Sequence, residues 1–425
     1  MSVPPLPRQG PRPLPLQLWN ATGVWLSSRA GLPLLKSGSL PLRLDFADRA
    51  RGLHESLAGI ALDALDAALE RELRTRAGAF LTGIETYRRH PYRRALPEPP
   101  VLWQEGTTRL LDYGAPADPA VLVVPSLINR AYILDLSSET SLLRHLAASG
   151  LRPLLLDWGA PASLERGFGL TEYIAGRLDA AAGIVEDEAQ GPFGLIGYCM
   201  GGLLALALAE RRPRSVRALA LLATPWSFHA ERGGQAQLLG ALAETLAIAF
   251  APLGELPVDV LQALFTAVDP LVALRKFTRF AKLAPDSREA RHFVAVEDWL
   301  NDGVPLTLPV ARECLAGWYG ADLPGRGLWH VAGRPVLPAR VRQPALIVVP
   351  AQDRIVPPAS AAALADALPG AERLTPALGH IGMIVGREAP RQVWQPLAAW
   401  LRRLLPRTGS KIRRGSLSNK RATRE

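Results

Sequence analysis

The chain has 425 residues, a net charge of +10 at pH 7 and a hydrophobic content of 48%. This length and composition suffice for one large folded core, and they exclude an intrinsically disordered protein or a small disulfide-stapled domain. Its two cysteines, Cys199 and Cys314, show neither disulfide nor zinc-ligand spacing, so we expect a cytoplasmic protein without a bound metal. Neither a secretory leader nor a transmembrane segment is expected.

Much of the positive charge lies at the C-terminal end. Residues 406–425 contain seven Lys or Arg and one acid, which accounts for about six of the ten excess positive charges. We expect this segment to be a disordered basic tail. Because the remaining chain carries little excess charge, nucleic-acid binding is not expected. Contact of the tail with an acidic partner surface is the alternative to a purely solubilising role.

The N-terminal quarter is predicted to lie outside the main core. Residues 1–50 are rich in Pro, Leu and Arg, which predicts an irregular arm. Docking on a lipid-like or polymer surface and a role as a transit peptide are the alternatives. Residues 51–98 carry apolar side chains at helical spacing, which predicts a helical extension of one or two amphipathic helices. We expect this extension to pack on the core or on a partner.

Residues 99–225 are predicted to form the first part of an α/β core. An apolar strand at 120–125 precedes a loop, and a helix is expected to begin near Leu136. A second buried strand at 193–196 is followed by the helix-forming run 203–210. The residues between this strand and this helix must therefore make a tight turn.

Cys199 stands in the middle of that turn. Gly197 and Gly201 lie two residues before and after it, which permits a strained backbone that pushes the side chain above the sheet. The helix that follows directs its N-terminal amides toward the sulfur and favours the thiolate. A nucleotide-binding strand-to-helix turn with an inert cysteine is the alternative, so the interpretation depends on partner residues.

Residues 226–342 are expected to be a lid or cap inserted into the core. The run 238–251 is apolar enough to suggest a membrane span, but Glu244 interrupts it and Pro252 ends it. An apolar lid helix, suited to a hydrophobic acyl chain, is therefore predicted. Cys314 is expected to be a packed helix residue of the same lid.

Residues 343–405 are predicted to complete the core and to supply an acid and a histidine. Asp353 follows a buried apolar strand, and His380 follows a later short strand. Taken alone, Asp353 could be a surface ion pair with Arg354, and His380 could be an ordinary loop histidine. In α/β-hydrolases, however, the nucleophile, acid and base follow in this order, so Cys199, Asp353 and His380 are predicted to form a catalytic triad.

The predicted oxyanion hole uses two backbone amides. One belongs to Met200, the residue after the nucleophile, and the other to Ser126 or Leu127 in the loop after the first core strand. Asn129 and Arg130 of the same loop could instead simply fasten it.

Five segments, in this order, resemble the polyhydroxyalkanoate synthase family. They are V-P-S-L-I-N-R-A-Y-I-L-D-L at 124–136, L-D-W-G at 156–159, G-Y-C-M-G-G at 197–202, D-R-I-V-P at 353–357 and G-H-I-G at 379–382. The second and the last are most similar to the short synthases that work with a second, non-catalytic subunit. The resemblance extends over residues 100–405 and departs from the larger synthases at 298–302, where D-W-L-N-D stands in place of a W-N-x-D stretch.

The resemblance implies an α/β-hydrolase fold, with a mostly parallel sheet, helices on both faces and an inserted lid or cap. It also implies an acyltransferase that moves 3-hydroxyacyl groups from coenzyme A through a Cys199 thioester to a growing polyester chain. Acyl-coenzyme A would be the substrate, with no permanently bound cofactor. A homodimer or a second synthase subunit, and a place on the surface of polyester granules, are further implications. A cysteine-nucleophile thioesterase or polyester hydrolase and a non-catalytic granule-associated protein are the alternatives.

Overall fold

The computed structural model describes residues 7–41, 46–231 and 233–405. The predicted basic tail, 406–425, lies outside the described residues. The chain forms two compact units, which we name the sheet unit and the helical unit. The sheet unit comprises Pro97–Leu127, Glu139–Pro252 and the chain from Thr307 onward, and the helical unit comprises the chain up to Leu96, Ile128–Ser138 and Leu253–Leu306.

Within the described residues, the sheet unit contains an eight-stranded sheet in the order β1-β2-β6-β3-β7-β8-β13-β14. The strands are β1 (Val101–Glu105), β2 (Thr108–Asp112), β3 (Ala120–Val124), β6 (Arg152–Asp157), β7 (Phe193–Tyr198), β8 (Val216–Leu222), β13 (Ala345–Val348) and β14 (Glu372–Leu374). Strand β2 runs antiparallel to β1 and β6, and the other neighbouring strands are parallel. The predicted mostly parallel sheet is thus confirmed.

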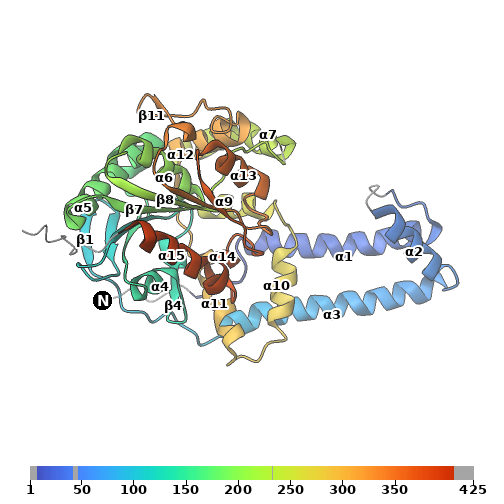
Figure 1. Ribbon diagram of the computed structural model, residues 1–425. Helices are drawn as coiled ribbons and strands as arrows, with labels where there is room; N and C mark the ends of the chain where they lie inside the picture. Colours follow the sequence, from blue (N-terminus) through green and yellow to red (C-terminus); the bar gives the residue numbers. More distant parts are fainter. Residues whose placement is uncertain (1–6, 42–45, 232, 406–425) are drawn as a thin grey trace, which may run out of the picture. The chain divides into compact units, whose positions relative to one another are not determined.

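Helices cover both faces of this sheet, with α5 and α6 on one face and α4 and α15 on the other (Figure 1). Every residue of β3 and β7 is therefore buried, as expected for central parallel strands. The helices of the unit are α4 (Leu142–Ala148), α5 (Asp179–Ala189), α6 (Met200–Arg211), α7 (Gly233–Ala241), α8 (Ala243–Phe250), α12 (Leu308–Arg312), α13 (Pro358–Ala367), α14 (Gly382–Val385) and α15 (Gln395–Leu404).

Shorter elements connect these helices and strands. They include the π-helical segments η4 (Glu172–Leu178), η6 (Glu313–Gly320) and η8 (Pro390–Trp394), and the 3₁₀ turns η3 (Glu165–Gly167), η5 (Ala251–Leu253) and η7 (Pro338–Arg340). Short strands are β5 (Thr140–Ser141), β10 (Leu306–Thr307), β11 (His330–Val331) and β12 (Arg334–Pro335). Strands β11 and β12 form a small antiparallel hairpin.

The helix expected near Leu136 begins later than predicted. Leu136 lies instead in the short strand β4 (Asp135–Ser137), after the 3₁₀ turn η2 (Ala131–Leu134). Helix α4 starts at Leu142 because the Ser141 side chain accepts a hydrogen bond from the amide of Arg144 and so caps the first turn.

The helical unit is built around two long helices. Its helices are α1 (Leu14–Ser37), α2 (Ala47–Leu57), α3 (Leu62–Arg89), α9 (Val258–Thr266), α10 (Val272–Phe280) and α11 (Arg288–Asn301), and it also holds the strands β4 and β9 (Glu255–Leu256). Helices α1 and α3 lie side by side, and α10 crosses α3 (Figure 1). Gly83 permits this crossing, because a Cβ there would overlap the backbone of Phe277. Phe80, Tyr87 and Phe280 fill the buried core beside it.

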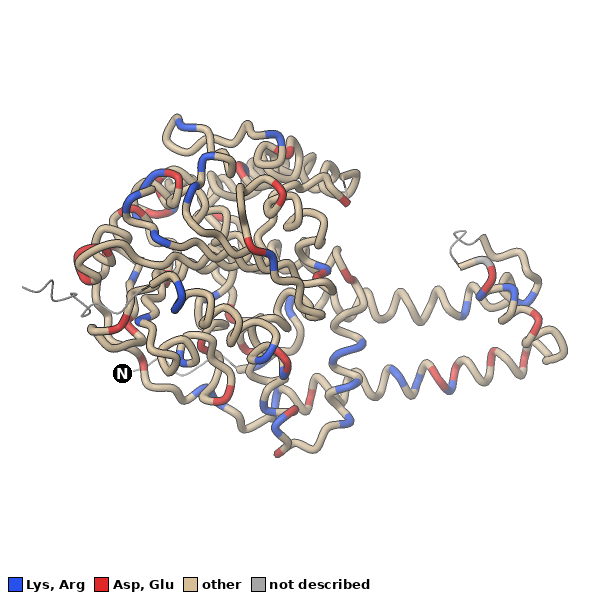
Figure 2. The backbone as a smooth tube through the Cα atoms, viewed as in Figure 1, with Lys and Arg blue, Asp and Glu red and all other residues tan. Residues whose placement is uncertain are grey.

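The expectation of an irregular arm over residues 1–50 is wrong, since α1 is a helix of 24 residues. Pro15 lies in its first turn, where a missing amide hydrogen costs nothing. Pro33 lies inside the helix and removes one donor, while buried Ala21 and Leu32 hold the helix in the unit. Figure 2 shows few charged residues along α1 and many along α3. The helical extension predicted for 51–98 is present in α2 and α3, and the residues that α3 buries, Phe80, Gly83, Ile84 and Tyr87, lie near its C-terminal end.

The predicted lid, 226–342, is divided between the two units, with residues 253–306 in the helical unit. The expected single apolar helix is two helices, α7 and α8, interrupted at Leu242. The stretch Gly233–Leu253 is long and apolar enough to cross a membrane, and 11% of its most apolar window is buried. Helix α7 packs on η6, where the backbones of Gly240 and Gly320 meet without intervening side chains. Its role as a lid remains a prediction.

Candidate active site

Cys199 lies between β7 and α6 in the predicted strained turn. Its backbone has φ 56° and ψ −127°, a region that L residues rarely occupy, so the surrounding structure must hold it there. A Cβ on Gly197 would lie 2.5 Å from the Cα of Gly202, and one on Gly201 would overlap the Val124 carbonyl. Both flanking glycines are therefore required by close packing.

His380 and Asp353 form a buried hydrogen-bonded pair in the same unit. His380 Nδ1 and Asp353 Oδ2 are 2.6 Å apart, and the Asp353 side chain is fully buried. The other carboxylate oxygen accepts hydrogen bonds from the amides of Ile355 and Val356, at 2.8 and 2.9 Å. These two amides fix the orientation of the carboxylate and, through it, that of the imidazole.

The electrostatics of His380 point to Cys199 as its second partner. Burial alone would lower the histidine pKa, but the negative charge of the Cys199 thiolate, together with hydrogen bonds to Asp353 and Cys199, outweighs burial and raises this pKa to about 10. The raised pKa favours the protonated imidazole between Asp353 and Cys199. The structure brings Cys199, Asp353 and His380 together, and their catalytic roles remain predictions.

Tyr198 contacts His380 in two ways, although no sequence motif singled it out. Its hydroxyl donates a hydrogen bond to the His380 carbonyl oxygen at 3.2 Å, and its ring stacks on the imidazole at 5.4 Å between centroids. Burial, followed by the charges of Cys199 and Asp353, raises the Tyr198 pKa well above its usual value. The phenol thus remains protonated and able to donate.

The residues of the predicted oxyanion hole lie around the start of α6. Met200 is the first residue of α6, whose initial amides have no acceptor within the helix. Gly201 packs directly on the carbonyls at the end of β3, which places the following loop, with half-buried Ser126 and buried Leu127, alongside the helix start. Trp158 of the L-D-W-G segment donates to the Pro125 carbonyl oxygen at 3.1 Å and holds this loop. Binding of an oxyanion by these amides remains a prediction.

Asn129 and Arg130 belong to the helical unit, where they fasten the loop. The side-chain oxygen of Asn129, a residue with φ 66°, accepts from Gln262 at 3.2 Å. The carbonyl oxygen of Arg130 accepts from the indole of Trp299 at 2.7 Å. Trp299 comes from the D-W-L-N-D stretch, so this stretch has a structural task within its own unit.

Tyr319 of η6 was also missed by the sequence analysis. Burial first, and then the charge of nearby Cys199, raises its pKa above the usual range. The Phe228 ring packs against it at 4.9 Å, and His229 contacts its carbonyl oxygen at 2.7 Å. A lone tyrosine in an apolar helical run carries no sequence signal, because only the fold brings it near the sulfur.

Cys314, predicted to be a packed helix residue, is buried in η6.

Metal ligands do not gather in the described ranges: no group of three or more His, Cys, Asp or Glu is suited to hold a metal ion there.

Comparison with known proteins places this chain in a family. A sequence model of the alpha/beta hydrolase fold matches residues 119–387. A poly(3-hydroxyalkanoate) polymerase subunit PhaC of Synechocystis sp. is 30% identical over 292 residues, which cover 66% of this chain and 77% of that protein. The subunit PhaC of Haloferax mediterranei is 29% identical over 313 residues, covering 71% of this chain. This chain spans 63% of that longer relative.

Among solved structures, a monoacylglycerol lipase of Paleococcus ferrophilus is 16% identical, with a TM-score of 0.45, and the match covers 69% of this chain and 98% of the lipase.

The family assignment rests on the match of the family sequence model, on the mostly parallel sheet and on the similarity to the Synechocystis protein. The chain belongs to the α/β-hydrolase fold family and, within it, to the poly(3-hydroxyalkanoate) polymerase subunits PhaC.

Proposed function

We propose that this protein is a polyhydroxyalkanoate-synthase-like acyltransferase that uses a Cys199–His380–Asp353 triad. The observation that carries the proposal is the buried His380–Asp353 hydrogen bond of 2.6 Å beside Cys199 in its strained turn, on a chain similar to named polymerases. The substrate would be a 3-hydroxyacyl-coenzyme A, and no permanently bound cofactor takes part.

The first half-reaction loads the enzyme. The Cys199 thiolate attacks the thioester carbonyl, and the amide of Met200 with that of Ser126 or Leu127 stabilises the oxyanion. The carbon–sulfur bond to coenzyme A then breaks, and His380 gives its proton to the departing thiolate. One thioester replaces another, so this exchange is nearly balanced in free energy.

The second half-reaction transfers the acyl group. Neutral His380 accepts the proton of an attacking hydroxyl, which belongs to a 3-hydroxyacyl group or to the growing chain. The new ester bond forms, the Cys199 thiolate leaves, and the thiolate–imidazolium pair is restored. Throughout, Asp353 holds Nδ1 protonated and stabilises the positive ring.

Water competes with the hydroxyl for the same thioester, so exclusion of water decides between synthesis and hydrolysis. Segments of the predicted lid in the sheet unit supply apolar side chains for this purpose. Tyr319 lies near the sulfur, and the Phe228 ring packs edge-on against Tyr319 and at a tilt against Trp318. This aromatic group supports a dry acyl site.

The test supplies 3-hydroxybutyryl-coenzyme A to the purified full chain and follows thiol release together with the fate of the acyl group. Polymer formation with equimolar thiol release is the expected result. Free 3-hydroxybutyrate in place of polymer would make the protein a thioesterase. Thiol release confined to one equivalent per chain would show acylation without transfer, and addition of a second synthase subunit would then be expected to restore turnover.

If neither thiol nor product appears with acyl chains of several lengths, with or without such a subunit, the acyltransferase proposal is overturned in favour of a non-catalytic role. In cells, the active protein is expected at the surface of polyester granules, which fluorescence microscopy of a tagged full chain can test.

A further inference from the structure

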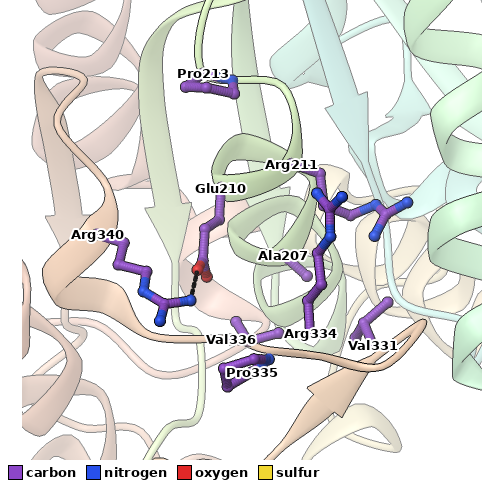
Figure 3. A pocket seen from close by; sticks show the side chains of 9 residues that line it. All are labelled: Ala207, Glu210, Arg211, Pro213, Val331, Arg334, Pro335, Val336 and Arg340. Carbon is purple, nitrogen blue, oxygen red and sulfur yellow. Dashed lines mark hydrogen bonds and ion pairs between the residues drawn. The ribbon is translucent and has the colours of Figure 1, made fainter.

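A cavity of about 270 Å³ lies at the C-terminal end of α6, within the sheet unit (Figure 3). Three arginines line it: Arg211 from the last turn of α6, Arg334 from β12 and Arg340 from η7. Val331 and Val336 add an apolar wall. The cavity lining thus combines positively charged and apolar side chains.

One of these arginines is already neutralised. Arg340 Nη1 lies 3.2 Å from Glu210 Oε1, the ion pair drawn in Figure 3, and Glu210 Oε2 accepts from the amide of Leu337 at 2.9 Å. Both oxygens of the lining carboxylate are therefore engaged.

The other two arginines lack such a partner. Among the described residues, Arg211 and Arg334 form no ion pair, and the Nε of Arg211 is buried without a hydrogen-bond acceptor. One nearby acid, Asp179, is already bound by Arg212, which donates to both of its carboxylate oxygens at 2.8 and 2.9 Å. These hydrogen bonds are the main reason that the pKa of Asp179 is lowered, and the charge of Arg211 adds only to that lowering. A buried donor left unpaired costs free energy, which an added acceptor would recover.

The backbone preorganises Arg334. Val331 pairs with Arg334 across the β11–β12 hairpin, and the two residues between them, Ala332 and Gly333, have φ 47° and 73°. Two positive φ values in a two-residue loop make the tight turn that matches the twist of a hairpin. In Figure 3 the Arg334 side chain extends from this hairpin toward Arg211.

We propose that this cavity binds a phosphate-bearing small molecule, at a site separate from the acyl-transfer site. Two guanidinium forks provide the paired donors that phosphate oxygens accept, and a dianion neutralises both charges at once. The apolar wall suits a small organic group attached to the phosphate, and the volume lies near the lower limit for ligand sites.

The separation from the acyl-transfer site follows from α6 itself. Cys199 precedes the first residue of this 12-residue helix, and Arg211 is its last residue. At 1.5 Å per residue, the two ends are about 18 Å apart. A ligand held by Arg211 therefore lies at the opposite edge of the sheet from the thiol.

The test measures binding of pyrophosphate and of inorganic phosphate to the full chain by titration calorimetry at constant ionic strength. We expect one saturable site per chain, and at least about tenfold weaker binding in R211Q and in R334Q, since each removes charge-assisted hydrogen bonds. The matched control is R402Q, which removes one exposed positive charge from α15 and should bind as the parent does.

Three outcomes would overturn the proposal. The first is the absence of saturable binding by the folded parent protein. The second is equal weakening in R402Q, because this would mean nonspecific attraction to the net charge. The third is displacement of pyrophosphate by free coenzyme A in a manner that depends on Arg334, since the cavity would then serve the substrate. Circular dichroism of each variant verifies that it is folded, and if R334Q unfolds, R211Q alone decides.

Discussion

The polar side chains at the two ends of α6 differ in whether they have partners. At its start, the strained turn of Cys199 meets His380 and Asp353, and each buried polar atom of that acid–base pair has a partner. At its end, Arg211 and Arg334 line a cavity, and neither forms an ion pair within the described residues. A closed network suits chemistry that depends on fixed geometry, whereas unpaired cations suit binding of an anion from solution.

The strongest test of this contrast is C199A, with C314A as its matched control. Removal of the sulfur at the start of α6 should abolish covalent acylation by 3-hydroxybutyryl-coenzyme A and lower turnover by about 10⁴-fold or more. C314A removes a buried sulfur of η6 and should acylate normally. Mass spectrometry of the intact protein detects the acyl adduct. An adduct retained in C199A would remove this residue from the role of nucleophile.

The second prediction concerns the acid. D353N keeps the size of the side chain but loses the charge that stabilises the imidazolium and fixes its tautomer, so turnover should fall by about 10³- to 10⁴-fold. Binding of phosphate at the far end of α6 should not change. D366N, on the exposed side of α13, is the control for loss of one negative charge. A D353N rate within a few-fold of the parent rate would show that the carboxylate is not part of the machinery.

These residues could be selected from sequence because each carries a local signal. The turn around Cys199 is defined by its flanking glycines. Asp353 follows the buried apolar strand β13, and His380 follows the short strand β14, which pairs with β13 in the sheet. Helix α1 was missed because its prolines read as breakers, although one lies in the first turn and Ala21 packs in the unit's core.

The remaining site residues could not be selected, since their roles arise from packing between distant segments. Tyr319 comes near Cys199 only through the fold, and Arg334 comes near Arg211 only because a hairpin turns back onto the end of α6. Neither has a neighbour in the sequence that marks it. A single sequence therefore does not show which distant side chains will meet, whereas it does show strands, turns and the order of the nucleophile, acid and base along the chain.

The third prediction concerns the pKa of His380 when the sulfur of Cys199 is removed. The His380 pKa of about 10 depends on the Cys199 thiolate, so C199A should lower it, and the imidazole should lose its proton nearer neutral pH. Nuclear magnetic resonance of the histidine ring measures this directly as pH rises. An unchanged pKa in C199A would mean that the thiolate does not face the ring.

The same raised pKa fixes the sign of a stability effect. The folded-state pKa exceeds the unfolded value of about 6.5, so the ion pair stabilises the fold fully below pH 6.5, and this contribution is lost as pH rises to about 10. The difference in unfolding free energy between the parent protein and H380Q should therefore shrink over this interval. A difference that grows with pH would contradict the assignment of the positive charge to His380.

The smallest expected effect is that of Y198F. It removes the 3.2 Å hydrogen bond to the His380 carbonyl oxygen but keeps the ring that stacks on the imidazole. Since one such bond contributes about 0.5–1.5 kcal/mol, kcat should fall by about two- to tenfold with KM unchanged. Y198L, which also removes the stacking, should lower kcat further and broaden the His380 ring resonances. If both variants instead change KM alone, Tyr198 contacts the substrate and does not position the histidine, and the closed network at the start of α6 is smaller than the geometry indicates.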